Sequence, residues 1–213
     1  MATRIKGVFA LLVVFALSAM AADSGTPLDG YLAGLTTWSA DFTQSVTDAR
    51  GRQSDAGQGT LTIMRPGRFR WEYAPAGAAP GAQLMVADGR DLWSHDRDLD
   101  QATRRPLKDA LQQAPVMLLA GDVSLQASYN IQPNGKRNGL EWARVIPKDK
   151  QSDVREALFG FKGRELARLE IVDKLGQRST LVFSNVKRNA AVDPKLMQFT
   201  LPPGVDLIGE PVK

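Results

Sequence analysis

The stretch RPGRFRWEYAP, from Arg65 to Pro75, constrains the fold most, because its side chains alternate between two chemistries. On an extended chain, a period of two places successive side chains on opposite faces of a strand. One face carries Arg68, Arg70 and Glu72, and the other carries Phe69, Trp71 and Tyr73. The aromatic face has two interpretations: it belongs to the core of an ordinary domain, or it lines a cavity for an apolar molecule.

Further extended runs follow along the chain. Asp88-Gly89 is a strong hairpin signal between two of them, and Asn134-Gly135 and Leu175-Gly176 link others. Such a series of antiparallel strands predicts a strongly curved sheet, open or partly closed, whose concave face must be filled. The expected strands are Phe42–Val46, Gly59–Met64, Arg65–Tyr73, Leu84–Val86, Leu92–Trp93, Ser128–Gln132, Leu140–Ile146, Val154–Phe161, Leu166–Val172 and Ser179–Val186.

Two helical segments interrupt the strands and are available to fill that face. The first begins with Thr26 as N-cap and Pro27 at the first helical position, and its apolar stripe runs from Leu28 to Trp38. The second runs from residue 106 to residue 121 and is divided by a proline at position 115. Its part from 116 to 119 is apolar all round, which predicts cover on more than one side. The pattern leaves open whether these helices form a permanent plug or a movable lid.

A third, shorter helical turn is expected at Asp193-Pro194, before a C-terminal extended tail. We find no internal repeat and no linker. Residues 22–213 therefore predict one mainly β domain with two or three small helices.

The N-terminus predicts export. Arg4 and Lys6 precede an apolar run from Val8 to Leu17, and small residues follow it. We interpret residues 1–21 as a cleavable secretory signal, with cleavage after Ala21 or, as the alternative, Ala22. The chain has no cysteine, so neither a disulfide nor a cysteine-linked lipid anchor is expected.

Charge argues against nucleic acid as a partner. The formal net charge is +4, and loss of the two basic residues of the signal lowers it to +2. Lysine and arginine are interspersed with acids, so the basic patch that binds a phosphate backbone is missing.

The inventory of reactive side chains argues against an enzyme. The only histidine is His95, between Ser94 and Asp96. Adjacent residues of a strand point to opposite faces, so these three cannot form a catalytic triad, and we interpret His95 as an exposed turn residue. Zinc and thiol sites lack ligands, and no glycine-rich phosphate loop is present. We therefore expect a monomer without catalysis, metal or cofactor.

Five motifs follow one another in the chain: FTQSVTD from Phe42, GQGTLTIMRPGRFRWEY from Gly57, VADGRDLW from Val86, DQATRRPLKDA from Asp100 and APVMLLAG from Ala114. In this order they resemble the LolA family of periplasmic outer-membrane lipoprotein carriers. The resemblance implies an unclosed antiparallel β-barrel, or half-barrel, whose apolar cavity is covered by a small helical lid. It also implies a periplasmic chaperone that takes lipoproteins from an ATP-driven inner-membrane release complex to an outer-membrane receptor.

The resemblance also suggests roles for individual residues. Arg65, in the matching motif, is expected to latch the lid by hydrogen bonds to backbone carbonyls of the lid; a solvated turn residue is the alternative. The expected lining of the cavity is Phe69, Trp71, Leu32, Leu35, Leu111, Met117 and Leu118.

The chain departs from the family pattern in two places. It has an Ala/Pro/Gly-rich insert between Tyr73 and Gln83, and the helix after Asp193 is reduced. A periplasmic binding protein or sensor for a small hydrophobic ligand would use the same half-barrel and is the alternative function.

Overall fold

The computed structural model describes residues 25–107, 118–121 and 127–208. The signal segment, its cleavage site and most of the second predicted helix, with Leu111 and Met117, lie outside the described residues. Within them, no helix has the length and apolar character that crossing a membrane requires.

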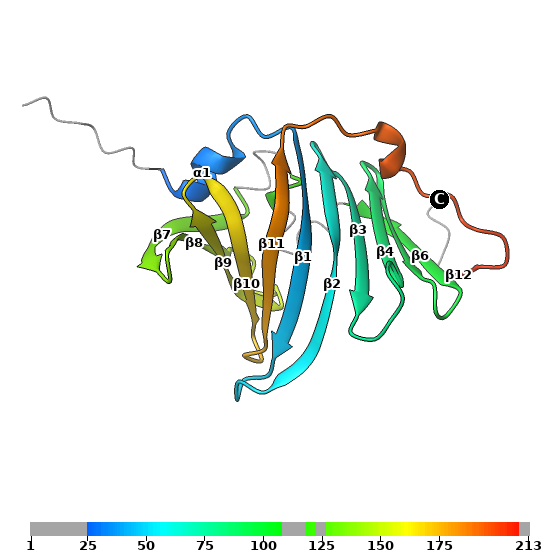
Figure 1. The fold of residues 1–213 in the computed structure, drawn as a ribbon, viewed down its shortest axis with the longest axis horizontal. Helices are drawn as coiled ribbons and strands as arrows, with labels where there is room; N and C mark the ends of the chain where they lie inside the picture. The colour runs from blue at the N-terminus through cyan, green and yellow to red at the C-terminus, as the bar shows by residue number, and fades with distance from the viewer. Residues whose placement is uncertain (1–24, 108–117, 122–126, 209–213) are drawn as a thin grey trace, which may run out of the picture.

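One sheet of 12 strands makes up most of the molecule, and it bends into a half-barrel (Figure 1). Its order is β12-β6-β5-β4-β3-β2-β1-β11-β10-β9-β8-β7. All neighbours pair antiparallel except β12, which runs parallel to β6. The predicted unclosed, mainly β fold is therefore confirmed. The strands are β1 (Thr37–Thr47), β2 (Gln53–Met64), β3 (Arg68–Pro75), β4 (Gln83–Asp88), β5 (Asp91–Asp96), β6 (Gln101–Pro106), β7 (Tyr129–Arg137), β8 (Leu140–Pro147), β9 (Val154–Lys162), β10 (Glu165–Asp173), β11 (Arg178–Arg188) and β12 (Asp206–Ile208).

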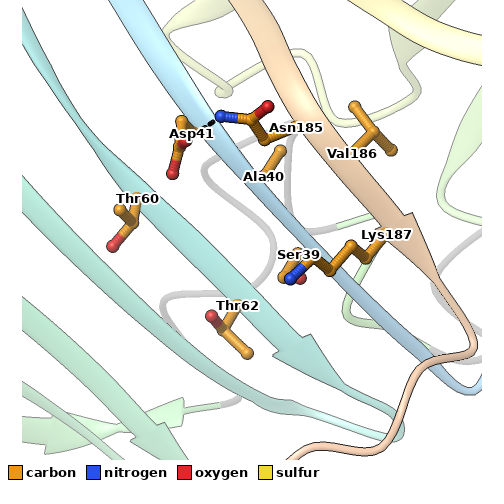
Figure 2. Close-up of a pocket in the computed structure, with 8 residues that line it drawn as sticks. All are labelled: Ser39, Ala40, Asp41, Thr60, Thr62, Asn185, Val186 and Lys187. Atoms are coloured by element: carbon orange, nitrogen blue, oxygen red, sulfur yellow. Dashed lines mark hydrogen bonds between the residues drawn. The ribbon is translucent and has the colours of Figure 1, made fainter.

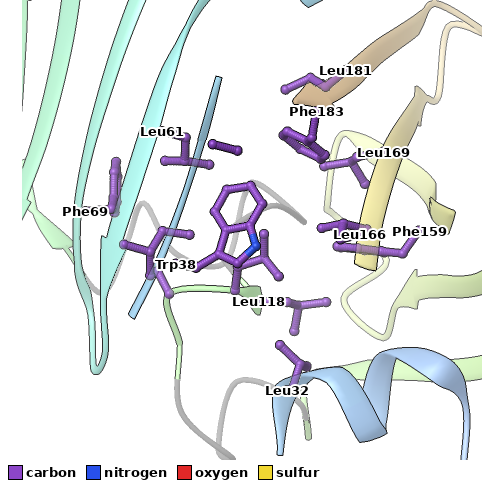
Figure 3. Close-up of a cluster of buried hydrophobic side chains, with 14 of the residues drawn as sticks. Leu32, Trp38, Leu61, Phe69, Leu118, Phe159, Leu166, Leu169, Leu181 and Phe183 are labelled. Atoms are coloured by element: carbon purple, nitrogen blue, oxygen red, sulfur yellow. The ribbon is translucent and has the colours of Figure 1, made fainter. Parts of the chain in front are cut away.

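The predicted alternation sorts side chains onto two faces of this sheet. Buried residues of neighbouring strands meet on the concave side, where they form one hydrophobic cluster (Figure 3). Trp38 of β1 lies at its centre, fully buried and edge-on to Phe183 of β11 at 5.2 Å between ring centroids. The core of the domain is thus the inner surface of the half-barrel.

The first helix is shorter than the apolar stripe predicted. Helix α1 spans Pro27–Leu32, and Thr26 and Asp29 form its capping box. The stripe continued to Trp38, but that residue lies in β1. Gly34 adopts a positive φ of 66°, which turns the chain away from helical geometry two residues after α1 ends. Burial of the next apolar side chains in the sheet then decides their conformation.

The chain after β11 crosses the outer face of β3 to β6 before it adds β12 at the edge (Figure 1). It carries the 3-10 helix η2 (Pro194–Met197), which confirms the helical turn predicted at Asp193-Pro194, and Asp193 is its N-cap. Phe199 packs against His95 of β5, with the rings 5.8 Å apart, and only 7% of His95 is exposed. The interpretation of His95 as an exposed turn residue was wrong, because a segment about 100 residues away covers it.

Candidate functional site

The aromatic residues of β3 form a wall on the concave face. Phe69 is 1% exposed, whereas Trp71 and Tyr73 are each 9% exposed. Phe42 of β1 lies across from them, 4.8 Å from Trp71 and stacked parallel to Tyr73 at 6.3 Å between centroids. The stripe therefore belongs to the core, as the first interpretation has it, and that it lines a cavity for an apolar molecule stays a prediction.

Two glycines of β2 make room for this wall. A Cβ at Gly59 would lie 2.8 Å from Cζ of Phe42, and one at Gly57 would overlap the Tyr73 ring. Strand β2 lies between β1 and β3, so the rings from both sides lean over its bare backbone. Any larger residue at these positions would push the aromatic rings apart.

The lid end of the concave face contains three of the predicted lining residues. Leu32 and Leu35 at α1, and Leu118 from the segment Leu118–Gly121, are at most 5% exposed and join the cluster that contains Phe69. The structure therefore brings these side chains together with the aromatic wall. Whether they contact a bound molecule stays a prediction, as it does for Phe69 and Trp71.

Arg65 connects both parts of this end through its side chain. Its Nε donates to the carbonyl of Gly121 at 2.6 Å, and Nη1 donates to the carbonyl of Leu32 at 3.1 Å. The backbone N–H of Gly67, in the same turn between β2 and β3, donates to the carbonyl of Ala120 at 2.7 Å. These contacts have the geometry that a latch would need, and its opening remains a prediction.

Sequence reasoning missed a second arginine that holds α1. Nη2 of Arg188, in β11, donates to the carbonyls of Tyr31 and Ala33 at 2.7 and 2.8 Å, and its guanidinium lies over the Tyr31 ring. The only local signal is a basic pair, Lys187-Arg188, at the end of a predicted strand. Such a pair says nothing about a helix more than 150 residues away.

Away from the lid, the concave face holds a pocket of about 350 Å³. Trp71, Tyr73 and Met85 supply its apolar wall, while Gln44, Gln83, Ser94 and Asp96 add polar groups. Burial raises the pKa of Tyr73, and the negative charge of Asp55 raises it further. The Tyr73 hydroxyl therefore stays neutral at physiological pH.

The outer face of the same strands offers a different surface. A hollow of about 610 Å³ lies at the junction of β1, β2 and β11, where Asn185 donates to Asp41 at 2.6 Å. Figure 2 shows the side chains that line it. Ser39, Thr60 and Thr62 line it with hydroxyl groups. Its polar lining does not suit an apolar ligand, so the concave face is the better candidate site.

Asp91 of β5 is the most deeply buried acid among the described residues, at 2% exposed. Arg104 lies against its carboxylate at 2.5 Å, and this hydrogen bond lowers the pKa of Asp91, with a further contribution from Arg90. The pair joins β5 to β6 and points to a structural role. No cluster of three potential metal-ligating side chains occurs in the described parts of the chain.

The model of the family "Outer membrane lipoprotein carrier protein LolA" matches residues 33–200. The chain belongs to the LolA family. This assignment confirms the resemblance found in the sequence motifs, and the match covers the sheet from β1 to β11 together with η2.

Curated relatives agree with the LolA assignment. An outer-membrane lipoprotein carrier protein of Chromobacterium violaceum is 38% identical over 208 residues, which cover 95% of this chain and 98% of the relative. One from Methylobacillus flagellatus is 35% identical over 203 residues, covering 95% and 96%. The similarity to these carrier proteins therefore extends over nearly their whole length.

Among solved structures, an uncharacterized conserved protein from Thermus thermophilus shares the fold. The TM-score is 0.53 at 12% identity, and the match covers 85% of this chain and 96% of the other. At that identity, the likeness bears on the fold and not on function. The LolA half-barrel is thus found on a chain with little sequence similarity.

Proposed function

We propose that this protein is a periplasmic chaperone that carries lipoproteins by sheltering their acyl chains on the concave face. It receives them from an ATP-driven inner-membrane release complex and delivers them to an outer-membrane receptor. Residues 1–21 direct export and are removed, and residues 22–213 form a single carrier domain. The protein acts as a monomer, by binding and release, without catalysis, metal or cofactor.

The physical task explains why an apolar inner surface is needed. A triacylated lipoprotein has on the order of 45 methylenes, and each is worth roughly 0.8 kcal/mol when buried. Exposure of these chains in water would therefore cost tens of kcal/mol, which prevents free diffusion across an aqueous compartment. A carrier must supply a dry and adaptable surface of similar extent.

The observation that carries the proposal is the aromatic wall of β3 on the concave side of an unclosed sheet, in a chain of the LolA family. Aromatic side chains provide large rigid contact area with little loss of conformational freedom. We infer that acyl chains displace lid residues from this wall. The proposed lining is Leu32, Leu35, Phe69, Trp71, Leu111, Met117 and Leu118, with Arg65 as latch.

The test places a carboxylate on this wall. In Trp71→Glu, the new charge must be desolvated when acyl chains enter, at a cost of several kcal/mol, so loading should be abolished. Inner-membrane spheroplasts are incubated with purified variants, and newly made lipoproteins are measured in the soluble fraction. Gln58→Glu is the matched control, because Gln58 is exposed and alternates with the inward-facing Gly57 and Gly59.

The two variants separate the possible results. Release by Gln58→Glu at the wild-type level, with none by a folded Trp71→Glu, supports the carrier. If Trp71→Glu releases lipoproteins normally, the wall is not the binding surface. Recovery of a free fatty acid or pigment, and no acylated polypeptide, with the purified wild type would favour the small-ligand alternative.

A further inference from the structure

Strand register arranges the concave face of β3, β4 and β5 in transverse rows. The row nearest the lid is Phe69, Ala87 and Leu92, the next is Trp71, Met85 and Ser94, and the last is Tyr73, Gln83 and Asp96. Rows lie about 7 Å apart, since each strand residue advances about 3.4 Å. Polarity therefore rises in steps from the lid to the far end of the face.

The far rows line the 350 Å³ pocket, which lies at the small end of the usual range for ligand sites, about 300–1,000 Å³. Gln44 of β1 faces the same pocket, because Gly57 beside it on β2 has no side chain. An apolar wall and a polar rim thus meet within one cavity.

Several polar groups of this rim have hydrogen-bonding capacity to spare. Within the described residues, the side chains of Gln44, Gln83 and Ser94 make no hydrogen bond. The buried Tyr73 hydroxyl makes none of ordinary length, although the Asp55 carboxylate lies near enough to raise its pKa. Asp96 differs, because its carboxylate already accepts from the backbone of Asp98 and Leu99. Gln83 is exposed and Gln44 and Ser94 are half-buried, so solvent can satisfy them, and only the buried Tyr73 hydroxyl is left unsatisfied at a cost. A ligand that pairs with this hydroxyl gains affinity, and the three other side chains are available to it as donors.

The charge of the pocket limits the chemistry of that ligand. Its rim offers neutral amide and hydroxyl donors, and no lysine or arginine lines it. His95 also borders the pocket, but its ring packs against Phe199 on the outer face of the sheet. Ester and amide carbonyls are suitable acceptors for such donors. A phosphate or free carboxylate would instead meet the carboxylate of Asp96 with no cation to compensate.

We propose that this pocket takes the ester- and amide-bearing head of the acylated cargo, while the acyl chains extend toward the lid, and that it disfavours phosphate-bearing lipids. The proposal rests on the proposed function, since it assigns a position to each part of a lipoprotein's lipid. It also supplies a physical basis for selecting lipoproteins over phospholipids, because both have similar chains and differ in their heads.

A pair of synthetic probes tests the head-group contacts. One is a tripalmitoylated S-glyceryl-cysteinyl peptide, and the other is its analogue with ether links in place of the two glyceryl esters. Wild-type protein should bind the ester probe more tightly by roughly 2- to 12-fold, the effect of one ordinary hydrogen bond. Gln83→Leu and Ser94→Ala should lower this preference toward unity without weakening ether binding, and Gln58→Leu on the outer face should leave it unchanged.

Vesicle competition tests the charge argument. Phosphatidylglycerol vesicles should compete poorly against the ester probe on wild-type protein. Asp96→Asn keeps an oxygen that can accept from the backbone of Asp98 and Leu99 but removes the negative charge. Phosphatidylglycerol vesicles should therefore compete with the ester probe roughly two- to fivefold better on this variant.

The results distinguish this proposal from the function on which it rests. Equal ester and ether binding by the wild type would overturn the head-group site, while the carrier function would stand. Effective phosphatidylglycerol competition on the wild type would overturn the charge selection. Failure of both acylated probes to bind would remove the carrier function itself, and the head-group site with it.

Discussion

Two parts of the lid end are held to the sheet in different ways. Helix α1 and the residues after it are tied to β11 and the chain beyond it, through Arg188 and through Asn189, which donates to Gly34 and accepts from Thr36. Among the described residues, Leu118–Gly121 is instead held through the turn between β2 and β3, by Arg65 and Gly67. Arg65 also donates to the Leu32 carbonyl of α1, so both parts share this side chain. The contrast teaches that α1 keeps its β11 anchors when Arg65 is lost, whereas Leu118–Gly121 loses its side-chain contact with the turn and keeps the backbone hydrogen bond from Gly67.

Removal of the latch should have the largest effect. Hydrogen bonds from a charged donor are worth about 1.5–3 kcal/mol each. Arg65 donates to the carbonyl of Gly121 in the lid segment and to that of Leu32 in α1, so Arg65→Leu should no longer favour the closed empty state. The variant should load lipoproteins, hold them more firmly and release them at least about tenfold more slowly to the receptor. The measurement is the fraction of lipoprotein left in a soluble complex after receptor is added.

Arg68 provides the matched control for this experiment. It begins β3 directly after the turn, and its guanidinium donates to the Arg65 carbonyl at 3.4 Å and to no other carbonyl among the described residues. Arg68→Leu should deliver cargo at the wild-type rate. Normal delivery by Arg65→Leu would mean that Arg65 is only a structural residue of the turn.

Loss of the α1 anchor should affect stability more than transfer. Arg188→Leu leaves the carbonyls of Tyr31 and Ala33 without their donor, which should lower the free energy of unfolding by about 2 kcal/mol. Denaturant titration measures this loss, and Lys187→Leu, at the neighbouring position, should be nearly neutral. If Arg188→Leu instead traps cargo as Arg65→Leu does, α1 moves too and the comparison between the two parts fails.

A smaller effect is expected at the start of α1. Thr26 accepts from the backbone of Asp29 at 3.2 Å, and the Asp29 carboxylate accepts from the Thr26 backbone at 2.9 Å. Thr26→Ala should cost about 1 kcal/mol in the free energy of unfolding, as for other N-caps, with loading and delivery unchanged. Thermal unfolding together with the transfer assay checks both points.

The free energy of unfolding should depend on pH in the alkaline range, and not near neutrality, because Tyr31 of α1 is buried. Burial raises the pKa of Tyr31, although the Trp38 hydrogen bond acts in the opposite direction. Because the folded pKa exceeds the ordinary value, this contribution to stability is complete below about pH 10 and is lost as pH rises toward the folded pKa. The free energy of unfolding should therefore fall above about pH 10, and less steeply in Tyr31→Phe.

If Tyr31→Phe leaves the pH dependence of the free energy of unfolding unchanged, the loss of stability at alkaline pH comes from other tyrosines. Burial also raises the pKa of Tyr73 and of Tyr129. Tyr129→Phe is the variant to compare with Tyr31→Phe. Tyr129 lies in the edge strand β7, which is far from α1 in the sequence.

Much of the strand layout was predictable because its signals are local. Alternation over a few residues identified β3 and β8 to β11, and Asp88-Gly89 identified the hairpin between β4 and β5. The caps at Thr26 and Asp193 were also readable, since each involves only neighbouring residues. The family motifs then led to Arg65 and the aromatic wall, whose roles in binding remain predictions.

Other features depend on contacts between distant segments. The apolar stripe that begins at Leu28 could not show that Trp38 lies in β1 and not in α1. The energy gained by burying the Trp38 side chain in the sheet outweighs its preference for helix or strand. His95 was interpreted as exposed, but the chain after β11 covers it. The role of Arg188 depends on α1, which packs beside it.

The sequence by itself determined most of the strands, their turns and their apolar faces, because periodicity, turn chemistry and capping act over a few residues. Strands β6 and β12 were not predicted. Only the tertiary structure decided which strands became neighbours, and hence which side chains share a row. That choice aligned Tyr73 with Gln83 and Asp96, and placed Gly57 where a neighbouring ring needs space. Such relations come from packing across the sheet, and no local pattern encodes them.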